Sequence, residues 1–133
     1  LVLPSKIKLL PNHTFRNSKP AIVGVKVEEG TLRQGVKIMK EDGTLIGRID
    51  AIQSKKESVE KAKKSEEVAV SIKDAVIGRN LFENDVLYTF IPQKQFSELE
   101  KMEDLSEGEK SILQKIKEIE TKSIEQEVKQ WTL

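Results

Sequence analysis

Basic side chains gather at the start of the chain, before its first acidic residue, Glu28. They are Lys6, Lys8, Arg16, Lys19 and Lys26. Residues 1–90 carry 16 basic and 12 acidic side chains, whereas residues 91–133 carry 7 and 10. A cationic region without compensating carboxylates favours the binding of a polyanion, because each cation attracts phosphate. The alternative is an ordinary solvated surface, and the residues alone leave both interpretations open.

No group of residues in the sequence predicts catalysis. His13 is the only histidine, cysteine is absent, and the carboxylates are scattered without an apolar setting that would raise the pKa of one of them. Neither a GxxxxGK[ST] phosphate loop nor a GxGxxG fingerprint occurs. One imidazole cannot complete a zinc shell, and no EF-hand spacing is present. We therefore expect a binding domain without catalytic residues or a metal site.

The composition is that of a folded domain, with 37% hydrophobic and 34% charged residues among 133. No run of about eighteen apolar residues occurs, so no membrane-spanning helix is predicted. The absence of cysteine excludes disulfides and favours a cytoplasmic location. The chain begins Leu-Val-Leu-Pro, without methionine or the layout of a signal peptide. We expect a fragment of a larger protein, monomeric by itself.

Short apolar runs separated by turn residues predict an all-β region. The runs are residues 21–27, 36–39, 45–52, 68–72 and 86–91. Asp42-Gly43 between two of them indicates a tight hairpin, and Leu32 is suited to plug the end of a barrel. Such strands close best into a small barrel, because closure removes exposed edges. Residues 54–67, rich in Lys and Glu, are predicted to form a solvated loop or a short, weak helix.

After residue 91 the apolar period becomes helical. Pro92 can open a first helix, with Phe96, Leu99 and Met102 on one face. Ser106 and Glu109 have the spacing of a capping box and predict the start of a second helix. Its apolar stripe comprises Leu113, Ile116, Ile119 or Glu120, Ile124, Val128 and Trp131. A stripe of this length must pack on the barrel, on the first helix or on a partner.

One turn and its surroundings resemble a known family. The turn is Gly-Thr-Leu-Arg-Gln-Gly at residues 30–35, which is similar to the signature turn of translation-factor β-barrels. It occurs with Phe-Arg-Asn-Ser-Lys-Pro-Ala-Ile at 15–22, Gly-Arg at 78–79, Glu-Asn-Asp-Val-Leu-Tyr at 83–88 and an acidic helical tail. Together these segments resemble domain IV, the last domain, of archaeal and eukaryotic translation initiation factor five-B.

The resemblance implies a mainly β fold with an α appendage. Residues 1–91 would form a small closed β-barrel of the translation-factor type, like domain two of elongation factor Tu, and residues 92–133 two C-terminal α-helices packed on it. The family resemblance implies binding of the aminoacylated end of initiator Met-tRNA while ribosomal subunits join. GTP and Mg²⁺ are expected in an upstream domain of the parent GTPase, and no cofactor in this chain.

The resemblance also implies a contact between Arg79, which follows Gly78, and the tRNA end. The planar guanidinium of arginine can grip a phosphate and stack on a base. The alternative for Arg79 is a surface ion pair with Glu83 or Asp85.

The first two strands offer further candidates for the same ligand, which needs cations, a stacking surface and a small pocket. They are Arg16, Lys19, Phe15 and Gly24. Phe15 could instead be a core plug. Lys56 lies in a loop that the family brings near the tRNA end, and Arg48 either lines the ligand face or faces water.

In the family, the helices with the adjoining barrel face also receive the apolar, acidic tail of initiation factor one-A. The matching side chains here are Ile112, Leu113, Ile116, Ile119 and Lys115, with Lys110 and Lys117 nearby and Trp131 at the end. Most of this stripe is expected to be internal, and Trp131 to anchor the helix. Two other functions stay open: a protein-interacting adaptor that uses the barrel as a scaffold, and a ribosome-contacting barrel of another translational GTPase.

Overall fold

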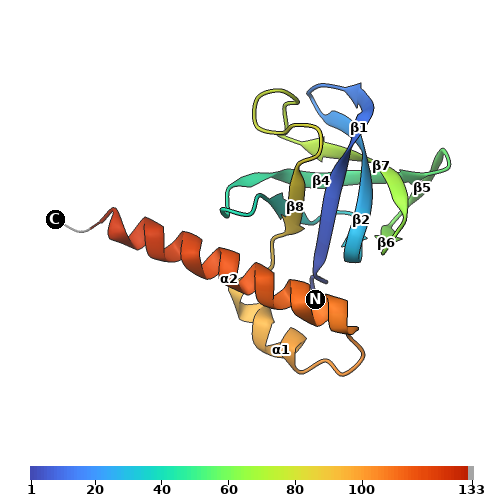
Figure 1. Ribbon diagram of the computed structural model, residues 1–133. Coiled ribbons are helices and arrows are strands. Elements are labelled where there is room, and N and C mark those ends of the chain that lie inside the picture. The colour runs from blue at the N-terminus through green and yellow to red at the C-terminus, as the bar shows by residue number, and fades with distance from the viewer. Residues whose placement is uncertain (132–133) are drawn as a thin grey trace.

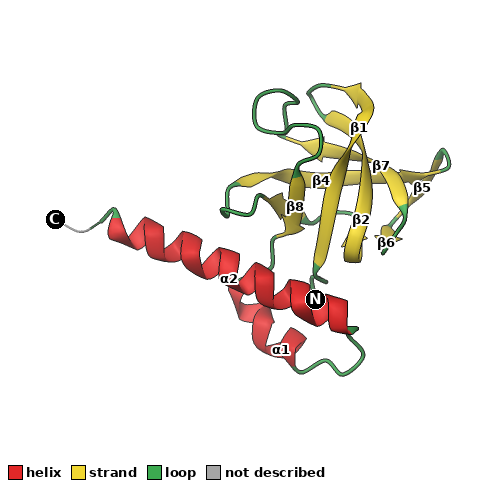
Figure 2. Ribbon diagram, viewed as in Figure 1, coloured by secondary structure: helices red, strands yellow, loops and turns green. Residues whose placement is uncertain are grey.

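The computed structural model describes residues 1–131 (Figure 1). In chain order its elements are β1 (Ser5–Arg16), β2 (Ala21–Arg33), β3 (Lys37–Met39), β4 (Leu45–Ser54), β5 (Glu57–Val59), β6 (Lys61–Lys63), β7 (Glu67–Lys73), β8 (Val86–Thr89), the 3₁₀ helix η1 (Gln93–Gln95), α1 (Phe96–Glu100) and α2 (Glu107–Lys129). Strands make up the first two thirds of the chain and helices the rest (Figure 2).

Six strands close into an antiparallel barrel, which confirms the predicted fold class. Their order is β1-β8-β3-β4-β7-β2, and the pairing of β1 with β2 closes the ring. The two short strands lie outside this ring, β5 on β4 and β6 on β2. Inward side chains alternate with outward ones, as in Val68, Val70 and Ile72 of β7, all of which are buried. Leu32 is fully buried, as expected for a barrel plug.

The expected hairpin turn at Asp42-Gly43 is present, whereas the expected turn at residues 30–35 is mostly strand: β2 continues through Gly30 to Arg33, and the chain turns only at Gln34 and Gly35. Gly43 has φ +89°, and the Lys40 amide donates to the Thr44 carbonyl at 2.9 Å. Gly30 has φ +78°, and a Cβ there would lie 2.0 Å from the Pro4 carbonyl oxygen. A larger residue at position 30 would therefore push away the segment that enters β1.

Residues 54–67 contain strands β5 and β6, so the prediction of a loop or weak helix was wrong. Lys55 and Lys56, with φ of 52° and 68°, form the two-residue turn between β4 and β5. In β6, Ala62 is buried opposite Leu32. Because lysines flank Ala62, the sequence carries no strand signal here. Pairing with the edge of β2 stabilises β6.

The helices pack beneath one end of the barrel (Figure 1). They form a second apolar cluster with the barrel end, made of Met39, Tyr88, Ile91, Phe96, Leu99, Leu105, Leu113, Ile116 and Ile119. The capping box is confirmed: Ser106 Oγ accepts from the Glu109 amide and Glu109 Oε1 from the Ser106 amide, both at 3.1 Å. The expected helix at Pro92 begins as η1 before α1. Among the described residues, no helix is long and apolar enough to cross a membrane.

Burial raises the pKa of the Glu120 carboxyl, which lies between α2 and the barrel end. The expectation that no carboxylate lies in such a setting was therefore wrong. The signal was concealed because Glu120 follows Ile119 on the apolar stripe, and both side chains point inward.

Candidate nucleic-acid interface

A groove of about 560 Å³ lies on the outer surface of the barrel. Three stretches that are distant in the sequence line it: the outer end of β1, the paired strands β2 and β7, and the β4–β5 turn. The lining residues are Leu10, His13, Phe15, Ile22, Gly24, Gln53, Lys55, Lys56, Glu67, Val68 and Ala69. We call this site the β2–β7 groove. It brings together three of the candidates from the sequence, Phe15, Gly24 and Lys56.

The floor of the β2–β7 groove is low because small residues form it. Gly24 of β2 pairs with Ala69 of β7. A Cβ on Gly24 would lie 2.8 Å from Cβ of His13, so the His13 side chain rests directly on the glycine. The His13 ring is held by a contact of 2.7 Å between Nδ1 and the Pro11 carbonyl oxygen. The protein's own His13 thus fills the space in front of Gly24, and close approach of a ligand to Gly24 stays a prediction.

Phe15 stands on the wall of the groove and is 65% exposed, so it is not a core plug. The pairing of β1 with β2 is interrupted between Leu9 and Thr14, and this irregularity carries the end of β1 away from the barrel interior. The Asn12 amide, within the interruption, donates to Glu83 Oε1 at 3.0 Å. An exposed aromatic ring beside a low floor is suited to stack on a planar base.

Two cations stand at the opposite wall. Lys55 and Lys56 are exposed, and their tight turn fixes both residues with positive φ. Glu67 is the acidic residue in the lining. The groove therefore combines an apolar floor, an aromatic wall and a cationic wall, as the end of an aminoacylated RNA strand requires.

Arg16, Lys19 and Arg79 lie outside the lining of the groove, at the end of the barrel: Arg16 is the last residue of β1, and Lys19 and Arg79 lie on the loops that follow β1 and β7. The loops touch, because the Ile77 amide donates to the Asn17 carbonyl at 2.9 Å. Arg16 Nε donates to the Ser18 carbonyl at 3.0 Å. Arg79 is exposed and forms no ion pair within residues 1–131, contrary to the alternative of a pair with Glu83 or Asp85.

Gly78 has φ +86° and open space around it, so it shapes the turn that presents Arg79. Arg48 is separate from both groups. It lies near the start of β4, where Nε donates to Asp50 Oδ1 at 2.9 Å.

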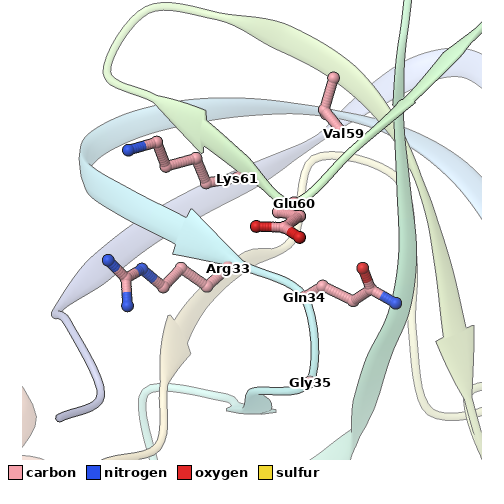
Figure 3. Close-up of a pocket in the computed structure, with 6 residues that line it drawn as sticks. All are labelled: Arg33, Gln34, Gly35, Val59, Glu60 and Lys61. Carbon is pink, nitrogen blue, oxygen red and sulfur yellow. The ribbon is translucent and has the colours of Figure 1, made fainter.

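A larger hollow, of about 890 Å³, is lined by Arg33, Gln34, Gly35, Val59, Glu60 and Lys61 (Figure 3). It contains none of the candidates from the sequence. The Gln34 amide donates to the Glu60 carbonyl at 2.9 Å, which ties the walls together. Its side chains are mostly polar or charged, and no aromatic ring is among them, so it offers a base no stacking surface.

On the helical tail, Leu113, Ile116 and Ile119 are buried, as expected for most of the stripe, and Ile112 is half-buried. Lys115 Nζ lies 2.8 Å from Glu41 Oε1. The hydrogen bond between them raises the pKa of Lys115 and lowers that of Glu41. Trp131 is 74% exposed, so the expectation that it anchors the helix was wrong.

Lys110 and Lys117 also have partners within the tail, Glu107 at 3.6 Å and Glu100 at 2.9 Å. The exposed apolar side chains of α2 are instead Ile124 and Val128, before Trp131. Among the described residues, no cluster of three or more His, Cys, Asp or Glu could hold a metal ion.

Sequence reasoning missed most of the lining of the groove. His13 could have been found, because it is the only histidine and stands two residues before Phe15. Gln53 and Lys55 could not, because their position depends on the unpredicted β4–β5 hairpin. Ile22 and Ala69 required the register of β2 on β7.

Comparisons with known proteins agree with this architecture. Residues 3–88 match the family model described as elongation factor Tu domain 4. The chain is 45% identical over 124 residues to a probable translation initiation factor IF-2 of Methanopyrus kandleri, and 46% identical over 127 residues to one of Metallosphaera sedula. These alignments cover 92% and 90% of the chain and 21% of each relative.

Among solved structures, GDP-bound aIF5B from Aeropyrum pernix is similar, with a TM-score of 0.87 and 40% identity. That match covers 93% of the chain and 21% of the aIF5B chain. The chain thus spans about a fifth of the length of the proteins it matches.

Proposed function

Because the chain belongs to the elongation factor Tu domain 4 family and corresponds to domain IV of the archaeal IF-2 (aIF5B) translation initiation factors, we propose that its β2–β7 groove binds the aminoacylated 3′ end of initiator Met-tRNA. The terminal adenine stacks on Phe15, the methionyl side chain lies over Ala69 beside His13, which covers Gly24, and Lys56 contacts the phosphate on the 5′ side of the terminal adenosine. Arg16 and Arg79, at the end of the barrel, add positive charge to the approach.

The observation that carries this proposal is the convergence of Phe15, Gly24 and Lys56 in one groove of about 560 Å³. Such a volume suits a ligand of the size of an aminoacyl-nucleoside. A groove without charged walls would suit any apolar ligand. Lys55 and Lys56 favour a ligand that also carries phosphate.

The proposal extends to the whole protein, of which this domain is a part. The upstream part binds GTP with Mg²⁺, and the factor acts on the ribosome while initiator tRNA is held by this domain. The relatives named as initiation factors and the GDP-bound state of the aIF5B structure support this extension.

The test is a titration of the chain with methionylated initiator tRNA and with the same tRNA stripped of methionine, followed by amide NMR. We expect shifts at Phe15, Gly24 and Lys56 that depend on methionine. Phe15→Ala should weaken binding about 30-fold, because stacking on an aromatic ring contributes about 2 kcal/mol. Phe82→Ala, which removes another exposed ring outside the groove, is the matched control.

Arg79→Ala and Lys56→Ala should weaken binding of both tRNAs, because they remove cations. Equal affinity of the wild type for the two tRNAs, with shifts confined to residues 92–131, would instead support the adaptor function.

We also propose that α2 binds the apolar, acidic tail of initiation factor one-A. The observation that favours it is the exposed set Ile124, Val128 and Trp131. This set replaces the buried Leu113, Ile116 and Ile119 as the contact surface, with Ile112 and Lys115 at its margin.

The single tryptophan makes the test direct. A peptide of the factor one-A tail should change the fluorescence of Trp131, and Ile124→Asp should abolish the change while the barrel stays folded. Ile116→Asp is unsuitable, because Ile116 is fully buried and its substitution would disrupt the core. A peptide that leaves the fluorescence and the NMR shifts of α2 unchanged would refute this second proposal.

A further inference from the structure

Three cations form a row across neighbouring strands of the barrel. Lys37 of β3 pairs with Arg48 of β4, and Arg48 pairs with Lys73 of β7. All three are exposed, and they line a hollow of about 310 Å³ together with Leu45, Ile46, Gly47 and Asp74. Like charges at opposed positions of adjacent strands repel one another, so the fold gains nothing from this arrangement. We call these three residues the cation row.

Arg48 is held ready for an anionic ligand. Arg48 Nε donates to Asp50 Oδ1 at 2.9 Å. The two terminal guanidinium nitrogens of Arg48 have no hydrogen-bond partner within residues 1–131. A guanidinium that is fixed along one edge can donate from the other edge to a phosphate. Lys37 and Lys73 also form no ion pair within the described part of the chain. Asp50 therefore acts as a positioning residue for Arg48.

The register of the strands links the cation row to the β2–β7 groove. Gly24, Ala69 and Gln53, all in the lining of the groove, form one cross-strand line over β2, β7 and β4. The next outward line along the same strands is Ile22, Ser71 and Ala51. The third outward line along these strands contains Lys73 of β7 and Arg48 of β4, which belong to the cation row.

Ala69, Ser71 and Lys73 thus point to the same outer face of β7. Ala69 and Lys73 are four residues apart, which is about 13 Å along a strand. On β7 only Ser71 stands between them. On β4 Ala51 is followed by Asp50, which lies at an irregularity of the β4–β7 pairing and contacts Arg48. The floor of the groove therefore continues along β7 as a low surface up to Lys73 of the cation row.

We propose that the cation row binds the phosphates of the nucleotides that precede the terminal adenosine, so that the acceptor strand runs along β4 and β7 with its 3′ end in the groove. This inference rests on the proposed function of the groove. Stacked nucleotides advance about 3.4 Å each along a strand, so the 13 Å path corresponds to about four nucleotides. The ligand of the row is thus the sugar–phosphate backbone of a short single strand.

The double variant Arg48→Ala/Lys73→Ala tests the row. The matched control is Arg33→Ala/Lys61→Ala, which removes the same residue types from another exposed cross-strand pair, beside the hollow of Figure 3. Each protein is titrated with methionylated and with stripped initiator tRNA at several KCl concentrations.

We expect the row variant to bind both tRNAs about tenfold more weakly, with a salt slope smaller by about 1.4, because a single strand contributes about 0.7 per phosphate contact. The preference for methionine should persist, and the control should bind as the wild type does.

A second probe, methionyl-adenosine, carries the terminal group without any preceding phosphate. It should bind the wild type and the row variant equally. Urea unfolding should show that the row variant is at least as stable as the wild type, because a repulsion has been removed.

The outcomes separate the two proposals. If the row variant binds tRNA like the wild type while Phe15→Ala loses affinity, the row is a solvated surface and this inference is wrong, but the groove stands. If weaker binding of methionyl-adenosine accompanies the row variant, the row belongs to the terminal site and the proposed path is wrong. If the wild type binds methionylated and stripped tRNA with equal affinity, the proposed function of the groove is wrong, and the proposed path of the acceptor strand is wrong as well.

Discussion

Glu120 connects the helical tail to the barrel through a buried carboxylate that is 4% exposed. Its Oε2 accepts from the Ile91 amide at 3.0 Å, and its Oε1 accepts from Gln93 Nε2 at 3.3 Å. Burial raises the pKa of Glu120, and the two hydrogen bonds oppose that shift without cancelling it. The residue thus satisfies a buried backbone amide at the cost of a desolvated charge.

Glu120→Ala should lower the free energy of unfolding by about 2 kcal/mol, because it leaves the Ile91 amide without an acceptor in the interior. Glu120→Gln keeps an acceptor oxygen and removes the charge, so it should be no less stable than the wild type at pH 7. Urea unfolding at pH 7 measures both. Equal destabilisation by the two substitutions would show that the charge itself, and not the acceptor, holds the tail.

The pH dependence of the Glu120→Gln difference follows from the direction of the pKa shift. A glutamate with a raised native pKa destabilises the folded state progressively as pH rises from its unfolded value, about 4.3, through its native value. Below that window the carboxyl is protonated in both states. The stability advantage of Glu120→Gln should therefore be largest at neutral pH and vanish near pH 4. Urea unfolding of both proteins across this range would contradict the assignment if the advantage grew on acidification.

At the scale of elements, α2 depends on its first turn as well as on its buried stripe. The reciprocal bonds of Ser106 and Glu109 satisfy two amides that the helix itself cannot pair. Glu107 and Glu109 also place negative charge at the helix N-terminus, where the backbone dipoles favour it.

Ser106→Ala should destabilise the domain by about 1 kcal/mol, the usual effect of losing such a cap. Ser111→Ala is the matched control, since Ser111 is exposed inside the same helix and alanine favours helix there. Chemical unfolding compares the two. A loss for Ser111→Ala as large as that for Ser106→Ala would exclude capping as the cause.

The same elements show what the sequence could predict. Local chemistry was sufficient for the Asp42-Gly43 hairpin and for the Ser106 cap, because adjacent residues determine both. It failed for β6, whose Lys-Ala-Lys composition offers one inward side chain and is stabilised by β2. Exposed lysines also protect that edge strand against further pairing.

The candidate site was harder to predict than the fold. Phe15 was selected for its aromatic chemistry, but its exposure depends on the irregular pairing of β1, which leaves no local signal in the sequence. Residues such as Ala69 have no chemistry of their own and enter the site through strand register alone.

At the scale of the whole molecule, β1 spans the distance between the two proposed binding surfaces. Its start lies beside α2, and its far end carries Phe15 at the opposite end of the barrel (Figure 1). The barrel between them is closed and densely packed, so neither surface shares a side chain with the other.

Binding at the two surfaces should therefore be independent. Saturation with methionylated tRNA should change the affinity for the factor one-A peptide less than about twofold, since separated sites couple by less than about 0.5 kcal/mol. Trp131 fluorescence measures the peptide affinity with and without tRNA. A larger change would show that the helices and the barrel move relative to one another.

The projecting part of α2 has a mechanical consequence. Glu120 is the last buried residue of the helix, and Lys129 ends it nine residues later, about 14 Å further along the axis. Beyond Glu120, Ser123 still lies against Gly43 of the β3–β4 turn, and the rest of the helix projects away from the barrel (Figure 1). A small tilt of α2 at its buried end would therefore displace Val128, near the tip, by a larger distance than it displaces Glu120.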